Sequence, residues 1–211
     1  MRLTHFGHSC LLADVDGTRL LFDPGVFSHG FEGITDLDAI LITHQHPDHV
    51  DRDRVAALVE ANPQAKLFAD PQTAAELGWP AFGPGQVETI GTVQVTGGGG
   101  RHAVIHPDIP VIDNTVYLVG TPERAQLVHP GDSLFVPSVP VDVLAIPAVA
   151  PWMKISETVD YLRAVRPRLA VPIHQAIASD AGAAIYTARL SEMSPAETEF
   201  RPLSPETEHE I

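Results

Sequence analysis

Four side chains that can bind a metal ion lie within six residues, in the stretch His44-Gln45-His46-Pro47-Asp48-His49. Neutral imidazoles combined with one carboxylate are a ligand set that suits zinc, iron, manganese, cobalt or nickel ions. If His44 and His46 leave the end of a strand as alternate residues, their side chains share one side and can bind one ion. Asp48 and His49, one step further along, can reach a second ion. The alternative is a loop of hydrogen-bonded histidines, but so dense a set of ligands favours a metal site.

A strand and a helix are expected on either side of this cluster. The short apolar run Ala39-Ile40-Leu41-Ile42 predicts a strand buried on both faces. Val55, Leu58 and Val59 mark one face of an amphipathic helix just after the cluster. The metal ligands are therefore expected at the point where a buried strand turns into a helix.

Three later residues are further candidate ligands. His102 follows a run of four glycines at 97–100, Asp132 lies in a glycine-containing turn, and His174 follows the hydrophobic strand predicted at 169–173. Considered alone, each of them is at least as well explained as an ordinary polar residue near the end of a strand as by metal ligation. Their order along the chain, together with the first cluster, makes ligation the better interpretation.

The stretch from His44 to His49, with its strand before and helix after, resembles the HxHxDH signature of the metallo-β-lactamase superfamily. The segment Gly131-Asp132-Ser133 is similar to the Gly-Asp-Ser/Thr segment of that family. Gly7-His8-Ser9 together with Phe22-Asp23-Pro24-Gly25 looks like the branch that contains ascorbate-6-phosphate lactonase. The resemblance covers nearly the whole chain, from the N-terminal hairpin to His174.

The resemblance implies a centre with two divalent transition-metal ions. Zinc is the first choice, and manganese, iron or nickel are alternatives. The implied ligands are His44, His46 and His102 for one ion, Asp48, His49 and His174 for the other, and Asp132 as the bridge. A hydroxide shared by the two ions is then the nucleophile, and Asp48 is the catalytic carboxylate expected to orient it and take its proton.

Four further residues are predicted to contact the substrate. His8 is expected either to touch the substrate or to hydrogen-bond a metal ligand. Arg101 and Lys154 are expected to bind an anionic group, with solvated surface cations as the alternative. Trp152 is expected at the mouth of the pocket. The glycine run at 97–100 predicts a close backbone approach or a mobile rim.

These residues predict a metal-dependent hydrolase that acts on an ester-like bond, in a lactone or phosphoester of a small metabolite. One alternative is a phosphodiesterase or nuclease of the same fold, and another is a metal-binding protein without activity. A lactone panel set against a phosphodiester panel separates the two enzymes.

Composition restricts the partners. The net charge of -14, with only 13 basic residues, makes nucleic acid an unfavourable partner. The single cysteine, Cys10, excludes an internal disulfide and is expected to be buried, which suits a cytoplasmic protein. No apolar run approaches the ~20 residues of a membrane span. A small-molecule substrate is expected, and a homo-oligomer stays open.

The expected fold is a single domain over residues 1–211, with a terminal tail at 194–211. Strands precede helices in each half of the chain, which predicts two packed sheets covered by helices. The class is α+β or α/β, and the resemblance implies a four-layer αββα sandwich with two mixed sheets. Helices are expected at about 157–165, capped by Ser156, and at about 180–191.

Overall fold

A tight hairpin at Asp16-Gly17 joins two antiparallel strands, as the sequence predicts, with Val15 paired to Thr18. This hairpin forms the middle of one of two β-sheets in the computed structural model, which describes residues 1–211. In spatial order, the strands of this first sheet are β13 (Glu208–Glu210), β1 (Arg2–His5), β2 (Leu11–Val15), β3 (Thr18–Phe22), β4 (Ala39–Ile42) and β5 (Lys66–Ala69).

The second sheet has seven strands and is also mixed. Strands β9, β10 and β11 run parallel to one another, whereas β6, β7, β8 and β9 are antiparallel. Its spatial order is β12 (Glu199–Phe200), β11 (Leu169–Ile173), β10 (Val141–Pro147), β9 (Arg124–His129), β8 (Thr115–Thr121), β7 (Val93–Gly99) and β6 (Val87–Ile90).

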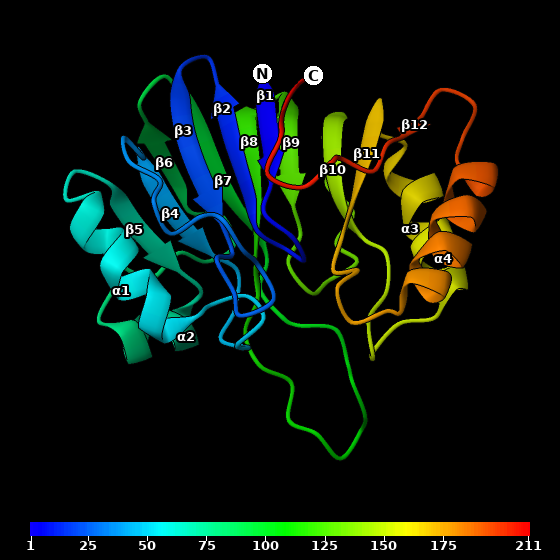
Figure 1. Cartoon of the computed structure of the whole chain (residues 1–211), viewed down its shortest axis with the longest axis horizontal. Coiled ribbons are helices and arrows are strands. Elements are labelled where there is room, and N and C mark those ends of the chain that lie inside the picture. The colour runs from blue at the N-terminus through cyan, green and yellow to red at the C-terminus, as the bar shows by residue number, and fades with distance from the viewer.

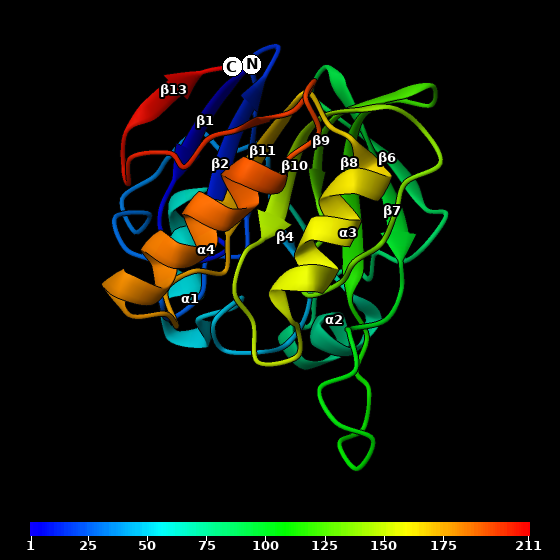
Figure 2. The same ribbon diagram turned by 90° about the vertical axis from the view of Figure 1, so that its right-hand side faces the viewer.

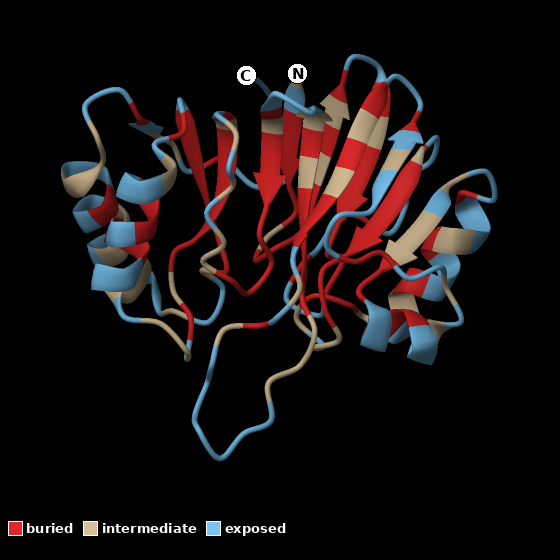
Figure 3. Cartoon of the chain, turned by 180° about the vertical axis from the view of Figure 1, so that it is seen from behind, coloured by how far each residue is buried: buried red, intermediate tan, exposed pale blue.

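The two sheets bury a shared apolar core between them. Alternate residues of β2, namely Leu11, Ala13 and Val15, face this core because side chains of a strand alternate between its two faces. They join Tyr117 and Val143 of the second sheet in one cluster of 21 buried residues. Figure 3 shows the buried positions concentrated on the strands of both sheets.

Helices cover the outer face of each sheet. Helices α1 (Arg52–Ala61) and α2 (Pro71–Leu77) flank the first sheet, and α3 (Ile155–Val165) and α4 (Asp180–Met193) flank the second (Figures 1 and 2). A second cluster that includes Ile40 packs under α1 and α2, and a third that includes Leu144 packs under α3. The predicted four-layer αββα sandwich is confirmed.

Several local predictions are confirmed, and two are wrong. Asp70 accepts hydrogen bonds at the start of α2, which ends at Gly78 in the left-handed conformation (φ 70°). Helix α3, however, begins at Ile155, because the backbone N–H of Lys154 donates to Glu157 at 2.6 Å; Ser156 is therefore not its cap. The segment 194–211, expected as a tail, forms edge strands in both sheets.

The glycine run belongs to a strand rather than to a loop. Gly97, Gly98 and Gly99 are the last residues of β7 and pair with β8. A Cβ atom on Gly97 would lie 2.1 Å from the carbonyl oxygen of Gly83, so the predicted close backbone approach is present. The long loop that follows β7 projects from the end of the sandwich opposite to the chain termini (Figure 1).

None of the four helices is both long and apolar enough to cross a lipid bilayer.

Candidate metal centre

Two groups of ligand side chains lie between the ends of the two sheets. The first group contains His44 and His46, which follow β4, together with His102 from the β7–β8 loop and Asp132 from the turn after β9. Its ligand atoms all lie within 4.8 Å of one another. The His44 and His46 rings face each other through Nε2 and Nδ1, 3.1 Å apart. The structure thus brings together residues that are far apart in the sequence.

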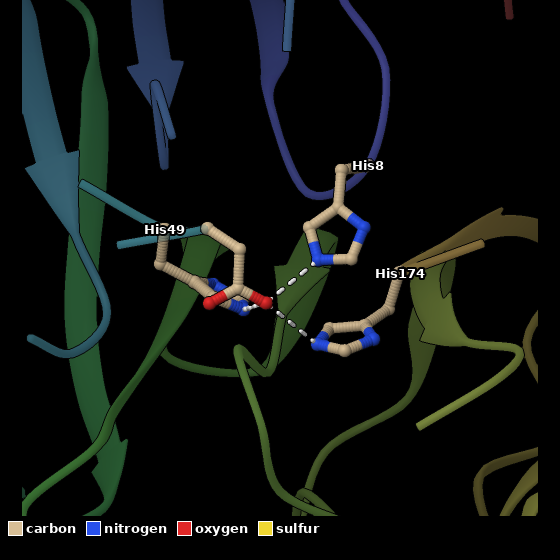
Figure 4. Close-up of side chains that lie close together, drawn as sticks. His8, His49 and His174 are labelled. Atoms are coloured by element: carbon tan, nitrogen blue, oxygen red, sulfur yellow. Dashed lines mark hydrogen bonds and ion pairs between the residues drawn. The ribbon is translucent and has the colours of Figure 1, made fainter. Parts of the chain in front are cut away.

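The second group contains Asp48, His49 and His174, and it also includes His8. Figure 4 shows the three labelled rings turned toward one carboxylate, that of Asp48. Asp48 Oδ2 is 3.0 Å from Nε2 of His8 and 3.5 Å from Nε2 of His174. His8 therefore lies among the ligands, closer to the centre than a substrate contact at the rim.

Asp132 lies between the two groups. Its Oδ1 atom is 3.1 Å from Nε2 of His49, and its Oδ2 atom is 3.3 Å from Nε2 of His102 and 3.2 Å from Nε2 of His174. Its backbone N–H donates to the side-chain oxygen of Asn114 at 3.0 Å, which fixes the turn. A carboxylate whose two oxygens face both groups has the placement that a bridging ligand needs.

Three histidines each donate a hydrogen bond from Nδ1 to another part of the protein, and their Nε2 atoms face the centre. His102 Nδ1 donates to the carbonyl oxygen of Ala103 at 2.6 Å, and His174 Nδ1 donates to that of Val149 at 2.7 Å. His49 Nδ1 donates to Asp23 at 2.7 Å. When the ring is neutral, these bonds keep its proton on Nδ1 and leave Nε2 free, which is the form that binds a metal.

The remaining nitrogens are buried without hydrogen-bond partners. Nε2 of His49, His102 and His174 and Oδ1 of Asp132 have none, although each of the three nitrogens lies 3.1–3.3 Å from an oxygen of Asp132. Buried polar atoms are nearly always paired, because an unpaired one costs about 1–3 kcal/mol. Several such atoms converging on one point are explained by metal coordination, so the donor set fits divalent ions.

Asp23 supports this centre and was not among the predicted site residues. It follows β3 with a left-handed backbone (φ 45°), and its side chain is fully buried. Besides the bond from His49, it accepts hydrogen bonds from the backbone N–H and the hydroxyl of Thr43, both at 2.7 Å. The Asp23-Pro24-Gly25 turn was visible in the sequence, but nothing there showed that it meets His49.

Trp152 contacts the bridging carboxylate directly. Its indole Nε1 donates to Asp132 Oδ2 at 2.7 Å, and its ring centroid is 6.0 Å from that of His102. Trp152 also lines a cavity of about 160 Å³ that opens onto the centre. The other lining residues are His46, Asp48, His102, Ile105, Asp132, Pro151, His174 and Ile177.

The structure does not bring Arg101 or Lys154 into that cavity. Both residues are exposed, and neither lines it.

His5 and His129, which carry no family motif, are buried and hydrogen-bonded to the backbone carbonyls of His8 and Ser9. His29 and His106 are exposed, His209 is half-buried, and all three lie outside both ligand groups.

Charges within the centre set the protonation of its ligands. Burial lowers the pKa of His44 well below its usual value, which keeps the ring neutral. Burial opposes the charged form of His174, but the carboxylates of Asp132 and Asp48 outweigh it and raise the pKa to about 9. Burial likewise opposes a charged His49, yet Asp132 and Asp23 raise its pKa well above the usual value. An incoming ion must therefore displace protons from His49 and His174.

Comparison with known proteins agrees with this geometry. The family model described as "Beta-lactamase superfamily domain" matches residues 2–174. "Protein Rv0786c" of Mycobacterium tuberculosis is 62% identical over 210 residues, which cover 98% of each chain. A "UPF0173 metal-dependent hydrolase" of Opitutus terrae is 29% identical, covering 82% of this chain and 84% of that protein.

A solved structure shares the fold at low sequence identity. The "Putative metal-dependent hydrolase" from Parabacteroides distasonis is 18% identical, with a TM-score of 0.76, and the match covers 95% of this chain and 91% of that one. The two ligand groups, the αββα sandwich and the family match all lead to the same assignment. The chain belongs to the β-lactamase superfamily of metal-dependent hydrolases, in its metallo-β-lactamase fold.

Proposed function

We propose that the protein hydrolyses an ester-like bond of a small molecule, in a lactone or a phosphoester, with two divalent ions at the centre. The observation that carries the proposal is the set of buried, unpartnered ligand atoms that converge from both sheets. Zinc is the first choice of ion, and manganese, iron or nickel accept the same ligands. Water adds across the bond, so the products are an acid and an alcohol.

The residues that would hold the ions follow from the two groups. His44, His46 and His102 would hold one ion, Asp48, His49 and His174 the other, and Asp132 both. Two ions placed in this way supply a Lewis acid for the substrate oxygen and lower the pKa of a shared water from ~15.7 toward ~7. No serine or cysteine nucleophile is needed, and the only cysteine, Cys10, is fully buried.

Asp48 is the residue that we assign to proton transfer. Its side chain is 21% exposed and lines the cavity, whereas that of Asp132 is only 4% exposed. Burial disfavours its charge, but the His174 and His8 rings, 3.5 and 3.0 Å from its Oδ2 atom, hold the pKa of Asp48 below its usual range. The carboxylate is thus ionised and faces the space where substrate and water meet.

His8 is a positioning residue for Asp48 in this proposal. Its Nε2 lies 3.0 Å from Asp48 Oδ2, and its side chain is fully buried. The backbone carbonyl of His8 accepts the N–H of His174 at 3.0 Å, and its own φ is 49°. A non-glycine residue in that conformation must be held by its surroundings, which here are the ligands themselves.

Metal analysis combined with activity tests the proposal. Protein purified without chelator should contain about two transition ions per chain, and it should turn over lactone or phosphoester substrates. His46→Ala and Asp48→Ala should abolish turnover, while His106→Ala, on the exposed part of the β7–β8 loop, should leave it unchanged. Absence of bound metal would contradict the proposal. Tightly bound metal without turnover on either panel would favour the non-catalytic alternative.

A further inference from the structure

Exposed apolar side chains surround the opening of the metal centre. Ile105 and Ile177 line the cavity and are 36% and 43% exposed, and each follows a ligand, His102 or His174, by three residues. Phe27 is 45% exposed, and its ring meets the His8 ring edge-on at 5.4 Å. Large apolar side chains gathered at a binding site, unlike single ones scattered over a surface, indicate what the site binds.

The apolar character continues along the projecting β7–β8 loop. Val104 and Ile109 on this loop are 58% and 46% exposed. No lysine or arginine lines the cavity, and the protein carries a net charge of -14. A phosphate or carboxylate on the non-reacting part of a substrate would thus find no lysine or arginine side chain in the cavity to pair with, and the net charge of the protein would disfavour it.

The cavity is also too small to enclose a whole substrate of ordinary size. Its volume is about 160 Å³, whereas sites for larger ligands occupy roughly 300–1,000 Å³. The reacting group fits beside Asp48 and Asp132. Everything else in the substrate must extend beyond the cavity, past Ile105 and Ile177, which line it and are exposed. Phe27, also exposed, contacts the ring of His8, which in turn lies beside Asp48 of the lining.

We propose that the substrate carries an uncharged alkyl or aryl group, which lies against Phe27, Ile105 and Ile177 while its ester-like bond is at the ligands. This inference rests on the proposed function and narrows it to lactones and other esters that carry an apolar group. It disfavours substrates whose non-reacting part is phosphorylated. Partial burial of each methylene at this opening is the source of the selectivity.

Binding of alkyl hydroxamic acids to the metal-loaded protein tests the inference without turnover, because a hydroxamate binds metal ions. The series runs from acetohydroxamic to octanohydroxamic acid, with affinity measured by calorimetry. We expect affinity to rise about two- to fourfold for each added methylene, up to the length of the apolar surface; a fully buried methylene contributes ~0.8 kcal/mol. Adipic monohydroxamic acid, which ends in a carboxylate, should bind more weakly than hexanohydroxamic acid.

Matched variants identify the surface. The double variant Ile105→Ser, Ile177→Ser should flatten the dependence on chain length, with acetohydroxamate binding unchanged. Val136→Ser, at an equally exposed valine that does not line the cavity, should keep the full dependence. Affinity that does not depend on chain length, or tighter binding of the carboxylate-ended compound, would overturn the inference.

Turnover of an ester series distinguishes this inference from the proposed function. Hydroxamate affinity that rises with chain length, without turnover of any carboxylic ester, lactone or phosphoester, would refute the proposed function and retain the apolar binding surface. Turnover combined with a hydroxamate affinity that does not depend on chain length would retain the proposed function and refute the apolar binding surface. A protein that takes up no metal ion would overturn both.

Discussion

The Nδ1 atom of His49 donates a hydrogen bond to Oδ2 of Asp23 over 2.7 Å, at a place where neither side chain is exposed. This bond links the strand β3 to a ligand in the β4–α1 connection. It fixes which nitrogen of His49 faces the metal, and the charge of Asp23 makes that nitrogen a stronger ligand. A residue outside the ligand set thus contributes to the properties of the centre.

The variant Asp23→Asn should weaken metal binding while preserving the fold. Asparagine tolerates the left-handed backbone at this position (φ 45°) and keeps one oxygen for the backbone N–H of Thr43. The charge is lost, and so is the second acceptor, which receives the hydrogen bond from Nδ1 of His49. We expect a loss of about 10- to 100-fold in affinity for the second ion. Competition with a chromophoric chelator measures this affinity. Asp160→Asn, on the exposed face of α3, is the control, and equal affinities in both variants would contradict the prediction.

Removing one ligand from one group at a time should abolish binding of the ion that this group holds and leave the other ion bound. In His102→Ala the first group loses a nitrogen, and in His174→Ala the second group does. Each variant should hold about one ion per chain instead of about two, because the opposite group keeps three ligands besides the shared Asp132. Elemental analysis after gel filtration gives the stoichiometry. Two ions retained in either variant would show that the group is assigned wrongly.

Replacement of His8 should affect turnover more than metal content. His8→Ala removes the donor to Asp48, so we expect kcat to fall about 10- to 100-fold while KM changes little. His8→Gln places an amide N–H near the position of Nε2 and should restore part of the rate. Both variants should retain about two ions per chain. Loss of an ion in His8→Ala would instead identify His8 as a ligand.

Gly25 should not tolerate a side chain. A Cβ atom there would lie 1.9 Å from the backbone oxygen of Asp48 and 2.6 Å from the backbone nitrogen of His49. Gly25→Ala must displace the ligand turn, and we expect a loss of about 1–3 kcal/mol in the free energy of unfolding, together with weaker metal binding. Gly33→Ala is the control, because no atom lies within 4 Å of its Cβ position. Chemical denaturation compares the two variants.

Asp70 should make stability fall as the pH rises. Burial raises the pKa of Asp70 to about 6 from the ordinary 3.8, and its Oδ2 atom has no hydrogen-bond partner. Between these two values the folded protein holds a proton that the unfolded chain has released. The contribution of Asp70 to stability therefore declines from about pH 4 to pH 6, and above pH 6 its full penalty remains.

Asp70→Asn should remove this dependence while keeping an oxygen for the cap of α2. The Tm difference, variant minus wild type, is expected to be more positive at pH 7 than at pH 4.5. Thermal unfolding in the two buffers measures it. A difference that stays constant with pH would show that Asp70 titrates normally.

The four layers of the sandwich and the seven ligands that the proposal uses could be predicted from patterns in the sequence. The cluster from His44 to His49 was recognisable because its ligands are close in sequence and lie between a buried strand and a helix. His102, Asp132 and His174 were identified only by their order, and the structure brings them into the same two groups. Strands and local turns followed from short-range patterns such as the Asp16-Gly17 hairpin.

What sequence reasoning missed depends on long-range contacts. Asp23 acquires its role through His49, which lies 26 residues later. The segment after residue 194 is rich in proline and glutamate, yet its residues Glu208–Glu210 pair with β1 at the other end of the chain. Gly97 lies in a strand at a point where the backbone of Gly83, 14 residues earlier, leaves no room for a side chain. Short sequence patterns do not indicate contacts between residues that are far apart in the chain.

The distribution of the ligands has a consequence for how the protein matures during synthesis. The nascent chain presents His44 early, but Asp132 and His174 emerge only after most of the second sheet has been made. Neither group would be complete before then, so the proposed centre would capture its ions late in folding. Because the ligands come from both sheets, ions bound there would join the two halves of the chain. In cells grown without metal, the full-length protein should therefore have its two sheets less firmly packed against each other at the ligand end.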